Sequence, residues 1–234
     1  MDELSGALQM ALVLIGRMDP GLIEIVWLSL QVSVTAVLFA SVVGFPLGAG
    51  LALSRFPGHK LVIVLLNALM GLPPVVVGLT VYLLLSRSGP FGELALLFTP
   101  TAMVIAQFIL VTPIISALTR QTIEDLWSEY EEQLRSLGAG RGRALLTLLW
   151  EGRYSLFTAV LAGFGRAIAE VGAVLIVGGN ITHVTRVMTT SIALETAKGN
   201  LELALALGMV LISLATIINA AVYLTKDLVY RYSD

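Results

Sequence analysis

The stretch Ser128–Glu151 reads SEYEEQLRSLGAGRGRALLTLLWE and is a long polar segment between extended apolar runs. The flanking runs carry almost no charged residues, whereas this segment carries many. The polar segment must therefore lie in water. Leu134 and Leu137 fall on one side of its first half, and Gly138 and Gly140 follow. This pattern predicts a short amphipathic helix, a glycine turn and a second helix. The charges within or just before the segment are Arg120, Arg135, Arg141, Arg143, Glu124, Asp125, Glu129, Glu131 and Glu132.

Composition identifies an integral membrane protein. Hydrophobic residues make up 57% of the chain and charged residues 13%, against about a quarter charged in soluble domains. The mean hydropathy is +0.90. There is no cysteine, which excludes disulfides, thiol nucleophiles and cysteine metal sites. His59 and His183 are isolated from each other, so no metal site is expected, and the net charge of -2 gives no reason to expect a nucleic-acid partner.

Five membrane spans and two shorter helices that do not cross are predicted, since a span needs about 20 apolar residues. Residues 1–18 carry an apolar stripe of helical period but are too short to cross, so they are predicted to lie in the membrane interface. The acidic N-terminus does not resemble a cleavable signal peptide. A threonine-rich helix over residues 187–197 is too polar and short to cross. The predicted spans are residues 22–53, 61–85, 94–118, 154–177 and 203–224.

The basic residues predict the orientation of these spans by the positive-inside rule. One side collects nine basic residues and the other only Arg17, Arg87, Arg186 and Lys198. We therefore expect a multi-pass protein of the cell (inner or plasma) membrane with its N-terminus outside and its C-terminus in the cytoplasm. Residues 120–152 form the cytoplasmic loop. The nine cytoplasmic residues are Arg55, Lys60, Arg120, Arg135, Arg141, Arg143, Arg153, Lys226 and Arg231.

Pro73 and Pro74 lie in the middle of the second predicted span. Two prolines remove two backbone donors, and irregular backbone at that depth requires protein or a water-filled cavity around it. The break is either a packing kink or a gate hinge. We predict a gate that joins it to the outward loop from Asn180 to Thr190, where the hydroxyls of Thr182, Thr185, Thr189 and Thr190 would offer neutral donors to an anion.

Arg166 and Glu170 interrupt the fourth predicted span. Ionisable groups within a span are costly and are paired or functional. A separation of four residues places them on one helix face, which predicts an ion pair that fixes packing. Direct contact of Arg166 with a substrate is the alternative.

The sequence holds no constellation that indicates catalysis. It has no nucleophile with an adjacent base, no glycine-rich phosphate loop followed by lysine, and no acidic metal cluster. The chain is therefore not expected to be an enzyme by itself, and any ATP must be bound by another chain. A membrane scaffold or an ATP-independent channel, with the polar segment as a solvated loop, is an alternative of a different class.

The polar segment resembles the cytoplasmic coupling loop of binding-protein-dependent ABC importer permeases. Glu132-Gln133-Leu134 stands where that family has Glu-Ala-Ala, Gly138 stands at its glycine, and Leu148 at its isoleucine. Trp150-Glu151 replaces the usual Leu-Pro. Residues 164–173 with 178–181, and residues 71–78, are similar to molybdate-type oxyanion permeases. Residues 149–154 and 189–199 are similar to the tungstate branch of that family.

This resemblance implies an all-α polytopic permease of the type I ABC importer class, a single transmembrane domain over residues 1–234, that imports tungstate. Molybdate or sulfate is the alternative cargo. The implied partners are a second copy of the chain, two cytoplasmic ATPase subunits that bind ATP and Mg, an extracytoplasmic oxyanion-binding protein and membrane lipid. No cofactor is implied in this chain. The coupling residues implied by the resemblance are Glu131, Glu132, Leu134, Leu137, Gly138, Ala139 and Gly140.

Overall fold

The fold is described from a computed structural model that covers residues 5–6, 9, 12–13, 16–17 and 19–233. These residues form helices, turns and loops, with no strand among them. The expected interfacial helix over residues 1–18 lies for the most part outside the described residues and stays a prediction.

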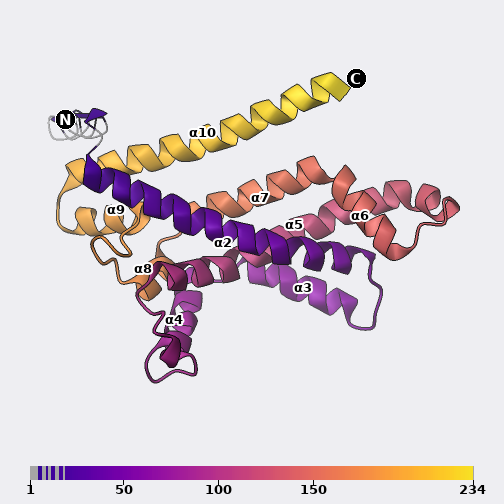
Figure 1. The fold of residues 1–234 in the computed structure, drawn as a ribbon, viewed down its shortest axis with the longest axis horizontal. Coiled ribbons are helices and arrows are strands. Elements are labelled where there is room, and N and C mark those ends of the chain that lie inside the picture. Colours follow the sequence, from indigo (N-terminus) through magenta and orange to yellow (C-terminus); the bar gives the residue numbers. More distant parts are fainter. Residues whose placement is uncertain (1–4, 7–8, 10–11, 14–15, 18, 234) are drawn as a thin grey trace. The chain divides into compact units, whose positions relative to one another are not determined.

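The described helices follow one another along the chain with short connections (Figure 1). Two pairs, α3 with α4 and α7 with α8, are separated only by brief irregular stretches. The helices are α2 (Pro20–Leu53), α3 (His59–Met70), α4 (Pro74–Leu85), the 3-10 helix η1 (Gly92–Leu94), α5 (Pro100–Ser136), α6 (Arg141–Glu151), α7 (Arg153–Ile168), α8 (Gly172–Gly178), α9 (Met188–Ala197) and α10 (Leu201–Ser233).

Three of these helices are long and apolar enough to cross a membrane: α2, α5 and the Leu201–Ile218 part of α10. The count rises to five if each interrupted pair forms one span. The described residues thus form an all-helical fold with three to five candidate spans. The five expected spans correspond to the upper count, and the break expected at Pro73-Pro74 is confirmed between α3 and α4.

Several predicted boundaries are wrong. The third span starts at Pro100 instead of Leu94, because η1 ends at Leu94 and both Ala95 and Phe98 have positive φ. The first helix of the polar segment is the continuation of α5 to Ser136, since residues 119–136 contain no glycine or proline that would end it. The fourth span is not one helix, because α7 ends at Ile168.

The described chain divides into two compact units, each assembled from separate stretches. Unit 1 contains residues 1–33, 74–106 and 168–234, and unit 2 contains residues 34–73 and 107–167. The expectation of a single domain over residues 1–234 stays a prediction.

In unit 2, α2 and α5 approach closely at Gly44 and Gly48. A Cβ on Gly48 would lie 2.3 Å from the carbonyl oxygen of Ser116, and one on Gly44 would lie 2.9 Å from Cγ2 of Ile115. Small residues four apart let the backbones of membrane helices approach, and this spacing is the small-xxx-small pattern. The α2–α5 contact therefore depends on the absence of side chains at these two positions.

The polar segment packs on the end of α2 through its apolar side. Ala49, Ile123 and Leu148 form a buried cluster in unit 2, so α2, α5 and α6 share one small core. Around it pack Ala52, Leu53, Leu126, Trp127, Tyr130, Leu134, Leu145 and Leu149.

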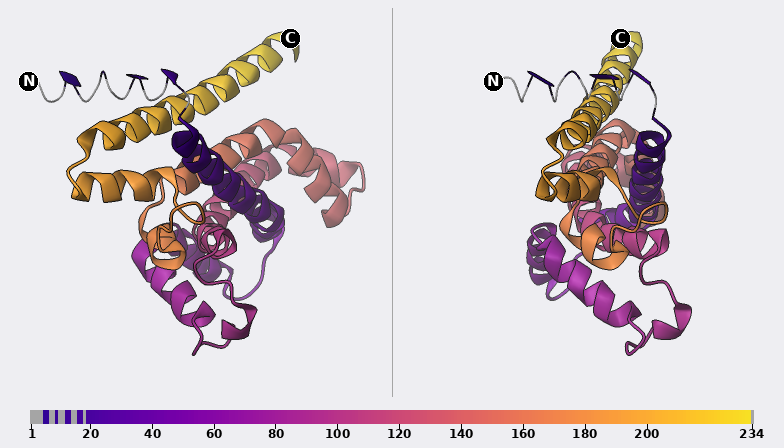
Figure 2. Two further views of the ribbon diagram at one scale, coloured as in Figure 1. Left: turned by 60° about the vertical axis from the view of Figure 1, so that its left-hand side comes forward. Right: turned by 90° about the vertical axis from the view of Figure 1, so that its left-hand side faces the viewer.

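Unit 1 contains two close helix pairs. A Cβ on Gly78 of α4 would lie 2.7 Å from Cα of Ala173 in α8, so these helices also approach through small residues. Figure 2 shows α9 and α10 as an antiparallel pair joined by a tight turn. Gly199 in that turn has φ 79°, a conformation that favours glycine.

We expect Gly48→Ala to lower the free energy of unfolding of the detergent-solubilised protein by about 1–3 kcal/mol, the usual cost of overpacking. The reason is that the new methyl group would overlap the Ser116 carbonyl oxygen. Thermal unfolding measures the change. Gly50→Ala, in the same helix, is the control, since no atom lies within 4 Å of its Cβ position. Equal stability of the two variants would show that the α2–α5 contact tolerates a side chain.

Candidate functional site

The loop between α8 and α9 is built from residues in unusual backbone conformations. Gly179 ends α8 with φ 71°, and Asn180 and His183 also have positive φ, at 50° and 63°. A Cβ on Gly179 would lie 2.8 Å from Cδ1 of Phe98, whose N–H donates to the carbonyl of Val177 at 2.9 Å. The loop is therefore fixed at its start by the turn at Gly179 and by its contacts with Phe98.

The threonines of this loop bond within it. The buried Thr185 hydroxyl donates to the Gly178 carbonyl and accepts from the Ile181 N–H at 3.0 Å. The Thr190 hydroxyl lies 3.0 Å from Oδ1 of Asn180 and accepts from the Val187 N–H at 3.2 Å. These bonds use the hydroxyls that were expected to face an anion. They give the two threonines a structural role, whereas the exposed Thr182 is left for solvent.

Glu170 stabilises the break between α7 and α8. It is buried, with 3% of its surface exposed. Its carboxylate oxygen Oε1 accepts the Ala173 N–H at 3.0 Å, in the first turn of α8, and its carbonyl accepts the Thr189 hydroxyl at 2.7 Å. Glu170 lies beyond the end of α7, so the single helix face expected to carry Arg166 and Glu170 is absent. Their ion pair stays a prediction.

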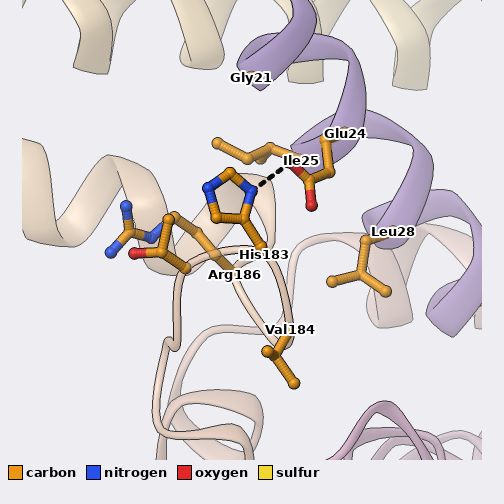
Figure 3. Close-up of a pocket in the computed structure, with 8 residues that line it drawn as sticks. Gly21, Glu24, Ile25, Leu28, His183, Val184 and Arg186 are labelled. Atoms are coloured by element: carbon orange, nitrogen blue, oxygen red, sulfur yellow. Dashed lines mark hydrogen bonds and ion pairs between the residues drawn. The ribbon is translucent and has the colours of Figure 1, made fainter.

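The loop also attaches to the first turns of α2, around a cavity of about 120 Å³ (Figure 3). Nδ1 of His183 lies 2.7 Å from Oε2 of Glu24, and the Met188 N–H donates to the Ser29 hydroxyl at 2.8 Å. Nη2 of Arg186 contacts the Asn180 carbonyl at 3.5 Å. The sequence predicts no contact between Glu24 and His183. No local signal joins residues so far apart in the chain.

Glu195 ties α9 to α10. It is 7% exposed and accepts hydrogen bonds from Nζ of Lys198 at 2.9 Å and from Nδ2 of Asn200 at 3.0 Å. The hydrogen bond from Lys198 is the largest cause that holds the pKa of Glu195 below its usual value, while burial opposes the shift. The carboxylate is therefore charged in the fold and fixes the turn between the two helices.

At the polar segment the predicted coupling residues fall into two groups. Leu134 packs into the unit 2 cluster, and Glu131 pairs with Arg135 at 2.6 Å. In contrast, Leu137 is 81% exposed, and Glu132, Gly138 and Gly140 are also exposed.

The turn between α5 and α6 has the expected glycine geometry. Gly138 has φ 69°, and the Ala139 N–H donates to the Leu134 carbonyl at 2.9 Å. Gly140 is extended, with φ -66° and ψ 159°, and precedes α6. The expected glycine turn and second helix are confirmed.

Two exposed apolar residues of α6 were not among the predicted site residues. Leu146 and Trp150 are 68% and 71% exposed and, four residues apart, share a helix face. The guanidinium carbon of Arg153 lies 5.1 Å from the ring centroid of Trp150. One sequence feature points to this face: Trp150 stands where importer permeases usually have leucine. That replacement alone does not predict that the side chain is exposed.

The break between α3 and α4 is organised by its prolines. The Gly71 N–H still donates to the Ala68 carbonyl at 3.1 Å, and Pro74 is the first residue of α4, where a missing N–H leaves no bond unmade. Pro73 lies between the helices. The role of this break in a gate stays a prediction.

Comparison with known proteins assigns the family. Residues 44–228 match the family described as "Binding-protein-dependent transport system inner membrane component". The chain belongs to this family. The family description as an inner membrane component agrees with the candidate membrane spans of the described helices.

Three relatives are similar over most of their length. The tungstate uptake system permease protein TupB of Peptoclostridium acidaminophilum is 43% identical over 97% of this chain and 100% of its own. A "Probable anion ABC transporter permease protein" of Haloferax volcanii is 41% identical over 85% of this chain and 88% of its own. The TupB of Campylobacter jejuni is 35% identical over 94% of this chain and 92% of its own.

We expect Thr190→Val to destabilise the protein by about 1–3 kcal/mol, because it leaves the buried Val187 N–H without its acceptor. Thr182→Val, the same change at an exposed loop position, should alter the free energy of unfolding by less than about 0.5 kcal/mol. Thermal unfolding in detergent measures both. Equal effects at the two positions would contradict the structural role of the Thr190 hydroxyl.

Proposed function

We propose that this chain is the membrane permease subunit of an ATP-driven, binding-protein-dependent importer of tungstate. The observation that carries the proposal is the 43% identity to a tungstate uptake permease over 97% of this chain and the whole of that relative. Molybdate and sulfate are the competing cargoes, since all three are tetrahedral dianions. The second tungstate relative supports tungstate.

In the proposed transporter, ATP binding and oxyanion capture are carried out by other subunits. Two cytoplasmic ATPase subunits bind ATP and Mg, and an extracytoplasmic protein captures the oxyanion. Two copies of this chain form the pore. Exposed apolar residues on α10, such as Ile212 at 68% and Ile217 at 64%, support contact with lipid or with the second copy.

The coupling surface is proposed at the α5–α6 turn. Its exposed residues are Glu132, Leu137, Gly138 and Gly140, with Leu146 and Trp150 of α6 extending the same polar segment. Leu134, Glu131 and Ala139 support the turn from within. The orientation is also proposed: by the positive-inside rule, the arginines near this turn favour the turn and the C-terminus in the cytoplasm and the N-terminus outside.

The translocation path is proposed to use backbone held in place by side chains. Pro73 and Pro74 interrupt the helix, and Asn180, Thr189 and Thr190 hold the α8–α9 loop through the bonds described above. The hydroxyls of Thr185, Thr189 and Thr190 are engaged, so these positions offer a fixed surface instead of a row of free donors. Arg166 and Glu170 are proposed as an ion pair that fixes packing near the second break.

Transport of tungstate is tested by uptake into vesicles that contain the permease, its ATPase and its binding protein. Tungstate should accumulate only with ATP. An equal concentration of unlabelled molybdate or sulfate should compete less well than unlabelled tungstate. Accumulation without ATP would favour a channel, and stronger competition by sulfate or molybdate would reassign the cargo.

Coupling is tested at Gly138. We expect Gly138→Val to reduce substrate-stimulated ATP hydrolysis several-fold, because a β-branched residue at φ 69° costs about 1–2 kcal/mol and distorts the turn. Gly142→Val is the matched control: Gly142 lies in α6 outside the proposed coupling residues, its φ is not positive, and both positions have open space around the new Cβ.

Membrane insertion should be equal in the two variants. If stimulation in Gly138→Val matches that of Gly142→Val, the turn does not transmit the ATPase signal. This result would leave the tungstate assignment untouched, since uptake is measured separately.

A further inference from the structure

A second cavity, of about 150 Å³, lies in unit 2 beside the polar segment. It is distinct from the exposed coupling residues Leu137 and Gly138, which do not line it. Its walls come from three separate stretches: the end of α2, the last turns of α5 and the first residue of α6. The lining residues are Leu53, Arg55, Trp127, Glu131, Arg135 and Arg141.

The cavity carries an excess of positive charge. Three guanidinium groups line it against a single carboxylate, that of Glu131, which pairs with Arg135 at 2.6 Å. Within the described part of the chain no carboxylate lies at ion-pair distance from Arg55 or Arg141. Like charges brought together repel one another unless an anion lies between them. The cavity therefore favours a negatively charged occupant.

The start of α6 adds to this field. The 11-residue helix begins at Arg141, and Gly140 before it supplies no side-chain cap. Helix N-termini are positive and favour acidic residues. The first turn of α6 has none and instead contains Arg141 and Arg143. The charge pattern is the reverse of the one that stabilises a helix in isolation, which is consistent with an external anion at this end.

The position of the cavity points to a membrane source for the anion. Leu53 is the last residue of α2, a candidate membrane span, and Arg55 lies two residues later. Trp127 also lines the cavity, and tryptophan is enriched at the level of lipid headgroups. Basic pockets at the cytoplasmic ends of membrane helices bind anionic headgroups. The volume is well above the roughly 10–15 Å³ that one water molecule requires.

We propose that this cavity binds a phosphate group, with the guanidinium groups of Arg55 and Arg141 on its oxygens and Arg135 held in place by Glu131. Planar guanidinium groups match the oxygen spacing of phosphate and bind it with charge-assisted hydrogen bonds. An anionic phospholipid headgroup is the source that the position favours. Free inorganic phosphate offers the same chemistry, so the test includes both.

The test uses the full-length protein, purified in detergent and depleted of lipid. Its thermal-unfolding midpoint is measured against dioctanoyl phosphatidylglycerol, against zwitterionic dioctanoyl phosphatidylcholine, and against inorganic phosphate at fixed ionic strength. A saturable rise with phosphatidylglycerol but not with phosphatidylcholine supports a lipid headgroup. A saturable rise with inorganic phosphate alone supports the free ion. A rise with both supports the shared phosphate chemistry.

Variants localise the site. Arg55→Gln and Arg141→Gln should each raise the half-saturating concentration about tenfold or more, as expected for loss of a charge-assisted hydrogen bond. Arg143→Gln is the matched control: it removes the same charge from the same turn of α6 but does not line the cavity, and it should change the concentration less than twofold.

The thermal-unfolding midpoint of each variant with ligand is compared with the midpoint of the same variant without ligand. If a glutamine variant does not fold, Arg55→Lys or Arg141→Lys replaces it. The lysine variants keep the charge but lose the planar fork, so they should weaken binding less than glutamine does. The proposal is overturned if no probe gives a saturable shift. It is equally overturned if Arg143→Gln weakens binding as much as Arg141→Gln, because the effect would then be general charge attraction.

Discussion

A backbone N–H or C=O within a bilayer needs a hydrogen-bond partner inside the protein, and this constraint governs where the helices break. Between α7 and α8 the buried Glu170 supplies an acceptor to Ala173, and Thr189 supplies a donor to the carbonyl of Glu170. Between α3 and α4 the prolines remove donors that would need partners. Polar residues near the breaks are thus explained first by backbone bonding, and any contact with cargo is additional.

Close approach between helices is the second requirement, since lipid supplies no hydrophobic drive between two apolar helices. Close approach is possible here at three glycines, because each lacks a side chain where another helix passes. They are Gly44 and Gly48 on α2 and Gly78 on α4. The spacing of Gly44 and Gly48 is readable in the sequence. The partner helix is not, because the position of Ser116 opposite Gly48 depends on tertiary packing that no local pattern encodes.

The long apolar helices α2, α5 and α10, the break at Pro73-Pro74 and the turn at Gly138 could be predicted, because hydropathy, proline and glycine act locally. The start of α5 at Pro100 could not, since Leu96 and Leu97 are as apolar as the helix that follows. The threonine hydroxyls were assigned to an anion because composition does not reveal that Asn180 and Val187 already engage Thr190. The contact of Glu24 with His183 joins residues 159 positions apart.

Helix α5 continues without a break into the polar segment. It therefore links the packing face of its apolar part with the packing face of its polar part, which the sequence predicts as two separate helices. Over residues 107–136, about 45 Å at 1.5 Å per residue, one helix carries both Val111, packed near Gly163, and Leu134 of the cluster around Ile123. Each residue step turns the helix by about 100°, so the angular phase of the apolar part sets that of the polar part. Insertions of one or two residues here would rotate the two faces against each other, whereas a multiple of seven would nearly preserve their phase.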